Sequence, residues 1–330
     1  MRVNENCAAC LYDKQRQVTD DPAYLDEVKR IIENRSENDT APYLVYLFGR
    51  EYERRYGKRA SYRDIKKRFN RLVLSMEDRI RKLIEADEDP LTAAMAYARI
   101  GNYIDYGALD HVDEETFLSL LQTKTMPEQE VRRHGQRKIR GGDYSLASQD
   151  TCAPSQASGV NKTLSSVYST LHNAAVCEQD KEAMDSMIRQ CAEAEHFLLI
   201  ADNCGEIVLD KLFLEQLKKR FPHLKITVLV RGGEVLNDAT VEDAREAGID
   251  QLADIVSNGT TVAGTVYEMI SREAKEAMDR ADVILAKGQG NYESLCRQGR
   301  HIFYSFLCKC DLFTGRFQVP KLTGILVEER

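Results

Sequence analysis

The sequence predicts an α/β fold, with a helical N-terminal domain followed by a Rossmann-like, mostly parallel sheet flanked by helices. Three observations lead to this fold class. The first half shows helical spacing of apolar residues, the second half alternates short β-rich runs with helical stretches, and polar or glycine-rich segments follow the runs. Alternating strands and helices favour a parallel sheet with right-handed crossovers, because each helix returns the chain to the same end of the sheet.

Four apolar runs are expected as strands, and they cover residues 196–201, 225–230, 254–256 and 282–286. Helices are expected to connect them at residues 206–220, 241–247 and 266–280. Two more helices, at residues 163–177 and 181–194, are expected to lead into the sheet.

The first half is expected to be helical at residues 24–34, 41–56 and 62–83, with loops at residues 35–40 and 57–61. Asp89 then precedes Pro90, which is typical of a helix start, since the carboxylate caps the helix and proline suits the first helical position.

The domain boundaries are expected near residues 125 and 162. Residues 1–125 would form the helical domain, residues 126–162 a linker or mobile loop, and residues 163–330 an α/β domain that binds metal and phosphate. The middle segment carries a basic cluster at residues 132–140 and then a stretch rich in Ser, Ala and Gln. Two interpretations stay open for it: a solvated linker, or a lid whose arginines meet an anionic substrate.

Composition narrows the class of protein. The chain has 330 residues, a hydrophobic fraction of 43% and a net charge of −7, which together argue for a soluble protein and against a nucleic-acid partner. No apolar run is long enough to span a membrane, and the first residues lack a signal-peptide core. The nine cysteines show no secreted disulfide pattern, so we expect a reducing, cytoplasmic location.

Polar side chains follow all four expected strands. They are Asp202 and Asn203, then Arg231 and Asp238, then Asn258 and Thr260, and finally Lys287. Parallel strands end at one edge of a sheet, and ligands of such folds bind there. Carboxylate and amide oxygens suit a divalent cation, and a lysine beside them suits a phosphorylated ligand. Asp202 or Asn203 as a simple helix cap, and Lys287 as a surface lysine, are the alternatives.

Several motifs add a resemblance to a known family. They are Cys7-x-x-Cys10, Asp202-Asn203-x-Gly205-Glu206, Arg231-Gly232-Gly233, Asn237-Asp238-x-Thr240, Ser257-Asn258-Gly259 and Lys287-Gly288-Gln289-Gly290-Asn291-x-Glu293. With these the sequence resembles the damage-control phosphatases, in the stand-alone branch with an N-terminal Cys-x-x-Cys. The resemblance implies a metal-dependent hydrolysis of phosphate monoesters of small metabolites, such as damaged or surplus sugar phosphates, nucleotides or cofactor fragments.

The resemblance also implies roles for individual residues. Asp202, Asn203 and Asp238 would bind the divalent metal, which could be Mn²⁺, Mg²⁺, Co²⁺ or Ni²⁺. Lys287 would contact the phosphoryl oxygens, and the backbone from Gly288 onwards could approach them because it lacks side chains. These four side chains, the three metal ligands and Lys287, are the catalytic residues that the sequence predicts.

A further set is expected to bind the substrate, and its members are Arg231, Asn258, Thr260, Gly288, Gln289, Asn291, Asn102, Asp105 and Glu206. Arg231 could clamp the phosphate or pair with a carboxylate. Glu206 could orient a metal-bound water or stabilise the first turn of a helix. Asn102 and Asp105 are three residues apart, which predicts one helix face, pointing either into the cleft or into a contact between the domains.

The cysteines pose a separate question. Cys7 and Cys10, together with Cys308 and Cys310, could bind a structural metal or do redox work if the ends of the chain meet. They could equally be small buried hydrophobic residues.

Two other functions stay open at this point: an adenosylmethionine-dependent methyltransferase acting on acidic residues, and a non-catalytic nucleotide or metal binder. The first is disfavoured because the turn after the first strand has a single glycine, Gly205. A small phosphorylated metabolite is the expected partner, and the sequence indicates no protein partner.

Overall fold

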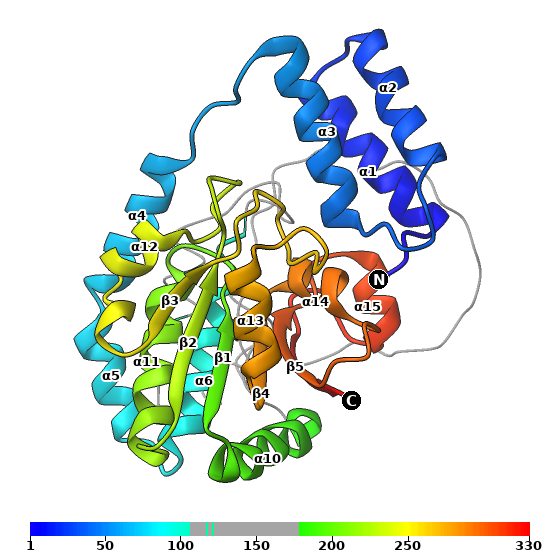
Figure 1. The fold of residues 1–330 in the computed structure, drawn as a ribbon. Helices are drawn as coiled ribbons and strands as arrows, with labels where there is room; N and C mark the ends of the chain where they lie inside the picture. The colour runs from blue at the N-terminus through cyan, green and yellow to red at the C-terminus, as the bar shows by residue number, and fades with distance from the viewer. Residues whose placement is uncertain (106–116, 118–120, 122–177) are drawn as a thin grey trace, which may run out of the picture.

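The structure, a computed structural model, describes residues 1–105, 117, 121 and 178–330 (Figure 1). Its second half is a six-stranded sheet with the strand order β3-β2-β1-β4-β5-β6. Strands β1 to β4 are His196–Ile200, Lys225–Val230, Asp254–Ser257 and Val283–Lys287. Strands β5 and β6 are Ile302–Leu307 and Gly324–Glu329. Neighbouring strands are parallel except for β5 and β6, which pair antiparallel. The predicted fold class is confirmed, but the last two strands were not foreseen.

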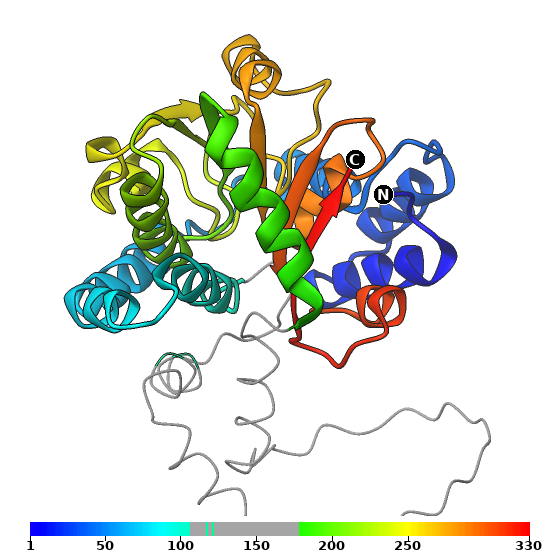
Figure 2. The same ribbon diagram turned by 90° about the horizontal axis from the view of Figure 1, so that it is seen from below.

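Helices cover both faces of the sheet (Figure 2). Those of the second half are α10 (Glu178–Glu193), α11 (Glu206–Arg220), α12 (Val241–Glu246), α13 (Arg272–Arg280), α14 (Gln289–Leu295) and α15 (Asp311–Phe317). Successive strand residues point to opposite faces, so Phe197 and Leu199 of β1 join the core under α11, whereas Leu198 and Ile200 join the core under α13 and α14. Burial on both faces explains why these strands are continuously apolar.

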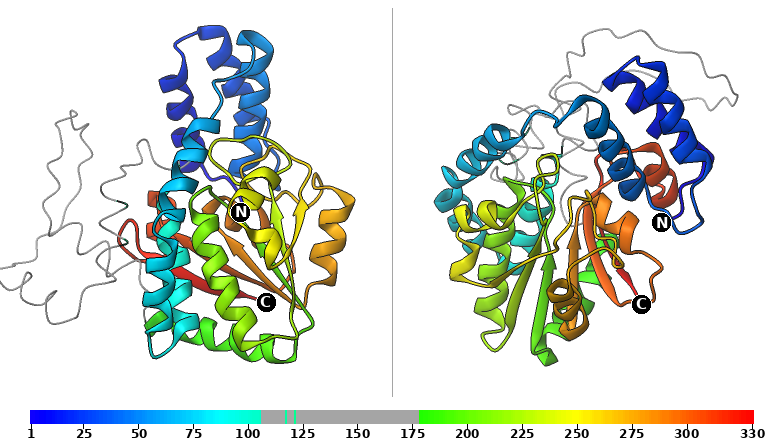
Figure 3. Two further views of the ribbon diagram at one scale, coloured as in Figure 1. Left: turned by 90° about the vertical axis from the view of Figure 1, so that its left-hand side faces the viewer. Right: turned by 45° about the horizontal axis from the view of Figure 1, so that its top comes forward.

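The N-terminal helices form two groups. Helices α1 (Glu5–Val18), α2 (Pro22–Glu33) and α3 (Ala41–Tyr56) have a core of their own, and α3 contacts α14. Helices α4 (Arg63–Leu74), α5 (Glu77–Glu85) and α6 (Pro90–Gly101) instead share the main core with α11 and the sheet. Figure 3 shows α1 to α3 standing beyond the edge of the sheet. The helical half is therefore divided between its own core and the core of the sheet.

Two helix predictions need correction. Residues 62–83 form two helices, because the chain bends at Ser75, whose hydroxyl donates a 2.7 Å hydrogen bond back to the carbonyl of Leu72. The helix expected from residue 266 begins only at Arg272, since Ser271 caps it by accepting from the N–H of Ala274 at 3.1 Å.

Some predictions fall on residues outside the described part. These are the boundaries at residues 125 and 162, the basic cluster at residues 132–140 and the helix at residues 163–177, all of which stay predictions. Among the helices that are described, none is long and apolar enough to cross a membrane.

Candidate active site

The candidate site lies where the order of the strands reverses. Strand β1 has β2 on one side and β4 on the other, so the crossover connections diverge from the gap between β1 and β4. Asp202 and Asn203 follow β1, and Lys287 ends β4 at the same edge of the sheet. Ligands of parallel α/β sheets bind in the crevice at such a switch point.

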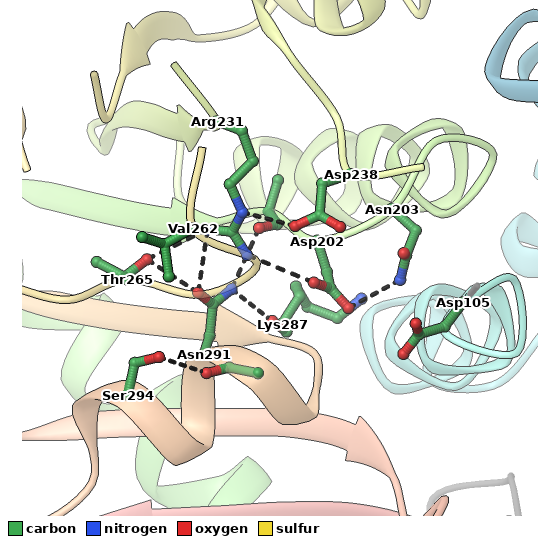
Figure 4. Close-up of polar contacts among 12 residues, drawn as sticks. Asp105, Asp202, Asn203, Arg231, Asp238, Val262, Thr265, Lys287, Asn291 and Ser294 are labelled. Carbon is green, nitrogen blue, oxygen red and sulfur yellow. Dashed lines mark hydrogen bonds and ion pairs between the residues drawn. The ribbon is translucent and has the colours of Figure 1, made fainter. Parts of the chain in front are cut away.

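Arg231 is the centre of a buried polar network (Figure 4). Its Nε donates to Asp238 Oδ2 at 2.7 Å, and its Nη2 lies 3.5 Å from Asp202 Oδ1. Its Nη1 donates to Asn291 Oδ1 at 3.2 Å and to Thr265 Oγ1 at 3.3 Å. The guanidinium is 1% exposed, so it holds the two carboxylates close together and is not a free clamp for phosphate. Of the two roles expected for Arg231, the structure shows carboxylate pairing.

Asp202 is held by amides from two segments. Asn203 Nδ2 donates to Asp202 Oδ2 at 2.8 Å and to Glu206 Oε2 at 3.0 Å. Asn102 Nδ2 donates to the same two oxygen atoms, at 3.0 Å each. Asn102 also accepts from the N–H of Leu307 on β5, which fixes the end of α6 against the sheet. The N-terminal half thus contributes directly to the site.

The expected pairing of Asn102 and Asp105 on one helix face is wrong. Helix α6 ends at Gly101, and the N–H of Asp105 donates to the carbonyl of Tyr103 in a turn. Asn102 reaches the carboxylates as described, whereas Asp105 accepts from Lys309 Nζ at 2.6 Å. The two side chains approach the site separately, because the chain has left the helix between them.

Lys287 is enclosed by acceptors. Its ammonium donates to Asp210 Oδ1 at 2.6 Å and to the carbonyl of Ala98 at 3.1 Å, and it lies 2.9 Å from Glu206 Oε1. The lysine side chain is 0% exposed. Burial alone would lower the pKa of Lys287, but the carboxylates of Asp210 and Glu206 outweigh burial and raise it, so the lysine stays charged. Its place in the structure is a buried ion-pair triad, which differs from the phosphate contact that the motif suggested.

Gly288 brings the backbone against Asp202. Its φ of +82° is in the region that favours glycine, and a Cβ at this position would lie 1.9 Å from Asp202 Oδ2. The N–H of Gly288 donates to the carbonyl of Ser305 on β5 at 3.0 Å. The glycine is therefore needed for the close approach of β4 to the Asp202 carboxylate, in addition to any contact with a ligand.

The site has more negative charge than its cations neutralise. The pKa of Asp202 is raised well above its usual range by burial, with Asp238 and Glu206 adding repulsion that Arg231 only partly offsets. Burial likewise raises the pKa of Asp238 to about 6, although Arg231 opposes the rise. Carboxylates in this condition favour a bound cation, because it would relieve both the repulsion and the cost of burial.

The expected metal ligands retain free oxygen atoms. Asn203 uses its Nδ2 for the neighbouring carboxylates, and Asp238 uses one oxygen for Arg231. Among the described residues, Asn203 Oδ1 and Asp238 Oδ1 accept no hydrogen bond, and Asp202 Oδ1 has only the 3.5 Å contact with Arg231. Two carboxylates and one amide carbonyl are hard oxygen donors, so the residues present fit Mg²⁺, Mn²⁺ or a similar ion.

Comparison with known proteins identifies the family. A family model described as the damage-control phosphatase ARMT1-like domain matches residues 3–323. The chain belongs to the damage-control phosphatase family.

Two relatives and one solved structure illustrate the relationship. A protein of Archaeoglobus fulgidus named damage-control phosphatase is 27% identical over 323 residues, covering 94% of this chain and 93% of the relative. Another of that name from Pyrococcus horikoshii is 35% identical over 162 residues, covering 49% of this chain and 54% of the relative. The crystal structure of a DUF89 family protein from Pyrococcus horikoshii superposes with a TM-score of 0.69 at 22% identity, covering both chains fully. The superposition supports the fold of this family member.

Three other predicted substrate residues lie around the network. Asn258 Oδ1 accepts from the N–H groups of Gly232 and Thr260, at 2.9 Å each, so this pair shapes the loops after β2 and β3. Asn258 Nδ2 is buried without a hydrogen-bond partner in the described part of the chain. Gln289 Nε2 donates to Glu293 Oε1 at 3.2 Å and to Cys310 Sγ at 3.5 Å, so it faces α14 and α15. Their substrate contacts stay predictions.

The four cysteines of the two motifs are free thiols in this family member. Burial raises the pKa of Cys7 and of Cys308 to about 12, which keeps both protonated near neutral pH. Within the residues that the structure covers, no group of three or more His, Cys, Asp or Glu side chains is placed to hold a metal ion. The arrangement offers no support for a shared thiolate site.

Two residues of the site were missed from the sequence. Asp210 lies four residues after Glu206 on α11, so helical spacing could have placed both carboxylates on one face toward Lys287. Lys309 follows β5 and contacts Asp105, and no local pattern indicated it because β5 itself was not predicted.

Proposed function

We propose that this protein is a metal-dependent phosphatase that hydrolyses phosphate monoesters of small metabolites, such as damaged or surplus sugar phosphates, nucleotides or cofactor fragments. The observation that carries the proposal is the buried pair Asp202 and Asp238, held side by side by Arg231 at the switch point of the sheet, with raised pKa values. Membership of the damage-control phosphatase family and the names of both relatives support a phosphatase acting on damaged metabolites.

Asp202, Asn203 and Asp238 would hold the divalent cation. When bound, such an ion would neutralise phosphate charge and lower the pKa of a coordinated water. The rest of the site prepares these ligands. Arg231 fixes one oxygen of Asp238, and Asn291, which accepts from Arg231, also donates to the carbonyl of Lys287 at 2.7 Å. The metal ligands are thereby tied to β4 and α14.

Glu206 is a positioning residue in this mechanism. Its Oε2 accepts from Asn102 and Asn203, so it orients the amide of Asn203 with the carbonyl oxygen directed elsewhere. Lys287, paired with Glu206 Oε1, keeps this carboxylate charged and in place. These contacts remove rotational freedom from the ligands before substrate arrives, which is how a preorganised site lowers a barrier.

The test measures phosphate release from p-nitrophenyl phosphate and a panel of sugar phosphates with Mn²⁺, Mg²⁺, Co²⁺ or Ni²⁺, after treatment with a chelator. Asp238→Asn keeps the shape but removes a charged ligand, so turnover should fall by about a hundredfold or more and Mn²⁺ affinity should fall with it. Asp250→Asn is the matched control, because Asp250 is exposed far along the chain from the site. Full activity without metal, or adenosylmethionine turnover in its place, would contradict the proposal.

We also propose a cytoplasmic location, which the free thiols among the described cysteines support.

A further inference from the structure

A second buried lysine lies beside the acidic network. Lys309 is 1% exposed and follows β5. Its Nζ donates to Asp105 Oδ2 at 2.6 Å, and its backbone N–H donates to Gln289 Oε1 at 3.2 Å. The lysine is thus fixed between the segment after α6 and the first residue of α14. Both of these segments also supply residues to the site, namely Asn102 and Asn291.

Asp105 connects this lysine to the candidate metal ligands. Figure 4 shows Asp105 on the side of the network where Asn203 lies. The negative charge of Asp105 contributes to the raised pKa of both Asp202 and Asp238, which places its carboxylate near both. The Asp105 side chain is 14% exposed, so the ion pair lies at the solvent-facing edge of the network. A ligand entering from solvent would reach this edge before the buried carboxylates.

The two lysines differ in how many of their protons are already used. An ammonium has three N–H donors. Those of Lys287 face Asp210, Glu206 and the carbonyl of Ala98, so each has an acceptor within the protein. Lys309 has one side-chain acceptor among the described residues, Asp105. Two of its N–H donors therefore stay available to a ligand.

We propose that Lys309 is the ammonium that contacts the phosphoryl oxygens of the substrate, and that Asp105 holds it in position. The inference rests on the proposed function. A phosphate monoester carries about two negative charges near neutral pH, and it needs cations whose donors are not already engaged. Arg231 is engaged by Asp238 and Lys287 by two carboxylates. Lys309 meets the requirement with no rearrangement of either network.

The experiment compares the parent with Lys309→Met, and Lys321→Met is the control, because Lys321 is an exposed lysine of the same C-terminal region. The probe is inorganic phosphate, whose affinity is measured by calorimetry on Mn²⁺-loaded protein and as competitive inhibition. Lys309→Met should weaken phosphate binding by about tenfold or more, the range of a charge-assisted hydrogen bond, and raise KM by a similar factor. Mn²⁺ affinity should stay within about twofold of the parent, since an ammonium is not a metal ligand.

A second variant separates phosphate contact from structural loss. Lys309→Met with Asp105→Asn removes both charges, so no unpaired carboxylate is left to destabilise the fold. The same loss of phosphate affinity is expected in this double variant, and Lys309→Arg should restore part of it. Parent-like phosphate affinity in either methionine variant would overturn the assignment. Failure of the proposed function looks different, because the parent itself would then release no phosphate with any metal.

Discussion

Removal of the Lys287 ammonium is the sharpest test of the buried triad. Lys287→Met keeps a long apolar side chain of similar reach but leaves Glu206 and Asp210 without their cation, at side-chain exposures of 0% and 1%. Breaking a buried ion pair by removing one partner costs about 3–5 kcal/mol, because the remaining charge is desolvated and unpaired. We expect a loss of stability in this range near neutral pH.

The loss should depend on pH in a defined direction. Burial raises the pKa of Asp210 to about 7, even though Lys287 opposes the rise. A carboxyl whose folded pKa lies above its unfolded value adds stability in its protonated form, and that stability disappears as pH rises through the folded pKa. Without Lys287 the pKa should rise further. Lys287→Met should therefore be most destabilised at pH 8 and closest to the parent at pH 5.

The assay is urea unfolding of metal-free protein, followed by circular dichroism at both pH values. Asp210→Asn and the double variant complete a mutant cycle, in which the two changes should couple by about 1–3 kcal/mol. Equal unfolding midpoints for Lys287→Met and the parent at pH 8 would refute the buried ion pair. Additive effects of the two substitutions would show that Lys287 and Asp210 do not interact.

Two other predictions follow from packing and from charge. Gly288→Ala should cost about 1–3 kcal/mol and lower turnover, because its Cβ would lie 1.9 Å from Asp202 Oδ2. Gly299→Ala, at φ +70° with no atom within 4 Å, isolates the backbone strain, and equal effects of both variants on turnover would disprove the clash. Burial raises the pKa of Glu293 to about 7 from 4.5, so Glu293→Gln should be more stable than the parent at pH 8 by up to roughly 3 kcal/mol. That gain should vanish at pH 4, and thermal melts at both pH values would expose a constant difference instead.

Local patterns were sufficient for the part of the site that lies on strand ends. Strands β1 to β4 each announce themselves by an apolar run, and parallel pairing then brings Asp202, Asp238 and Lys287 to one edge without further information. The apolar run of β5, Ile302–Leu307, is as strong as the others. It was passed over because no helix separates it from an antiparallel partner in the βα alternation that guided the prediction.

Partners across the fold could not be read from the sequence. Lys287 has the spacing of a phosphate ligand, but the carboxylates that enclose it come from α11 and a carbonyl from α6, and only packing brings these elements together. Asn102 and Asp105 were placed on one helix because a spacing of three fits a helix face. The helix ends at Gly101, where a glycine near the end of an apolar stretch was the available signal.

Charge balance explains why these segments converge on one point. The network and its borders contain five carboxylates, which are Asp105, Asp202, Glu206, Asp210 and Asp238. Three cations face them, and they are Arg231, Lys287 and Lys309. With all groups ionised, the described side chains leave a formal charge of −2, which one divalent cation would neutralise. Each cation pairs with a carboxylate, and the pairs of Lys287 and Lys309 join different segments of the fold, so the ion pairs that order the loops also leave the charge that attracts a metal. Structural stability and the proposed chemistry would then depend on the same contacts.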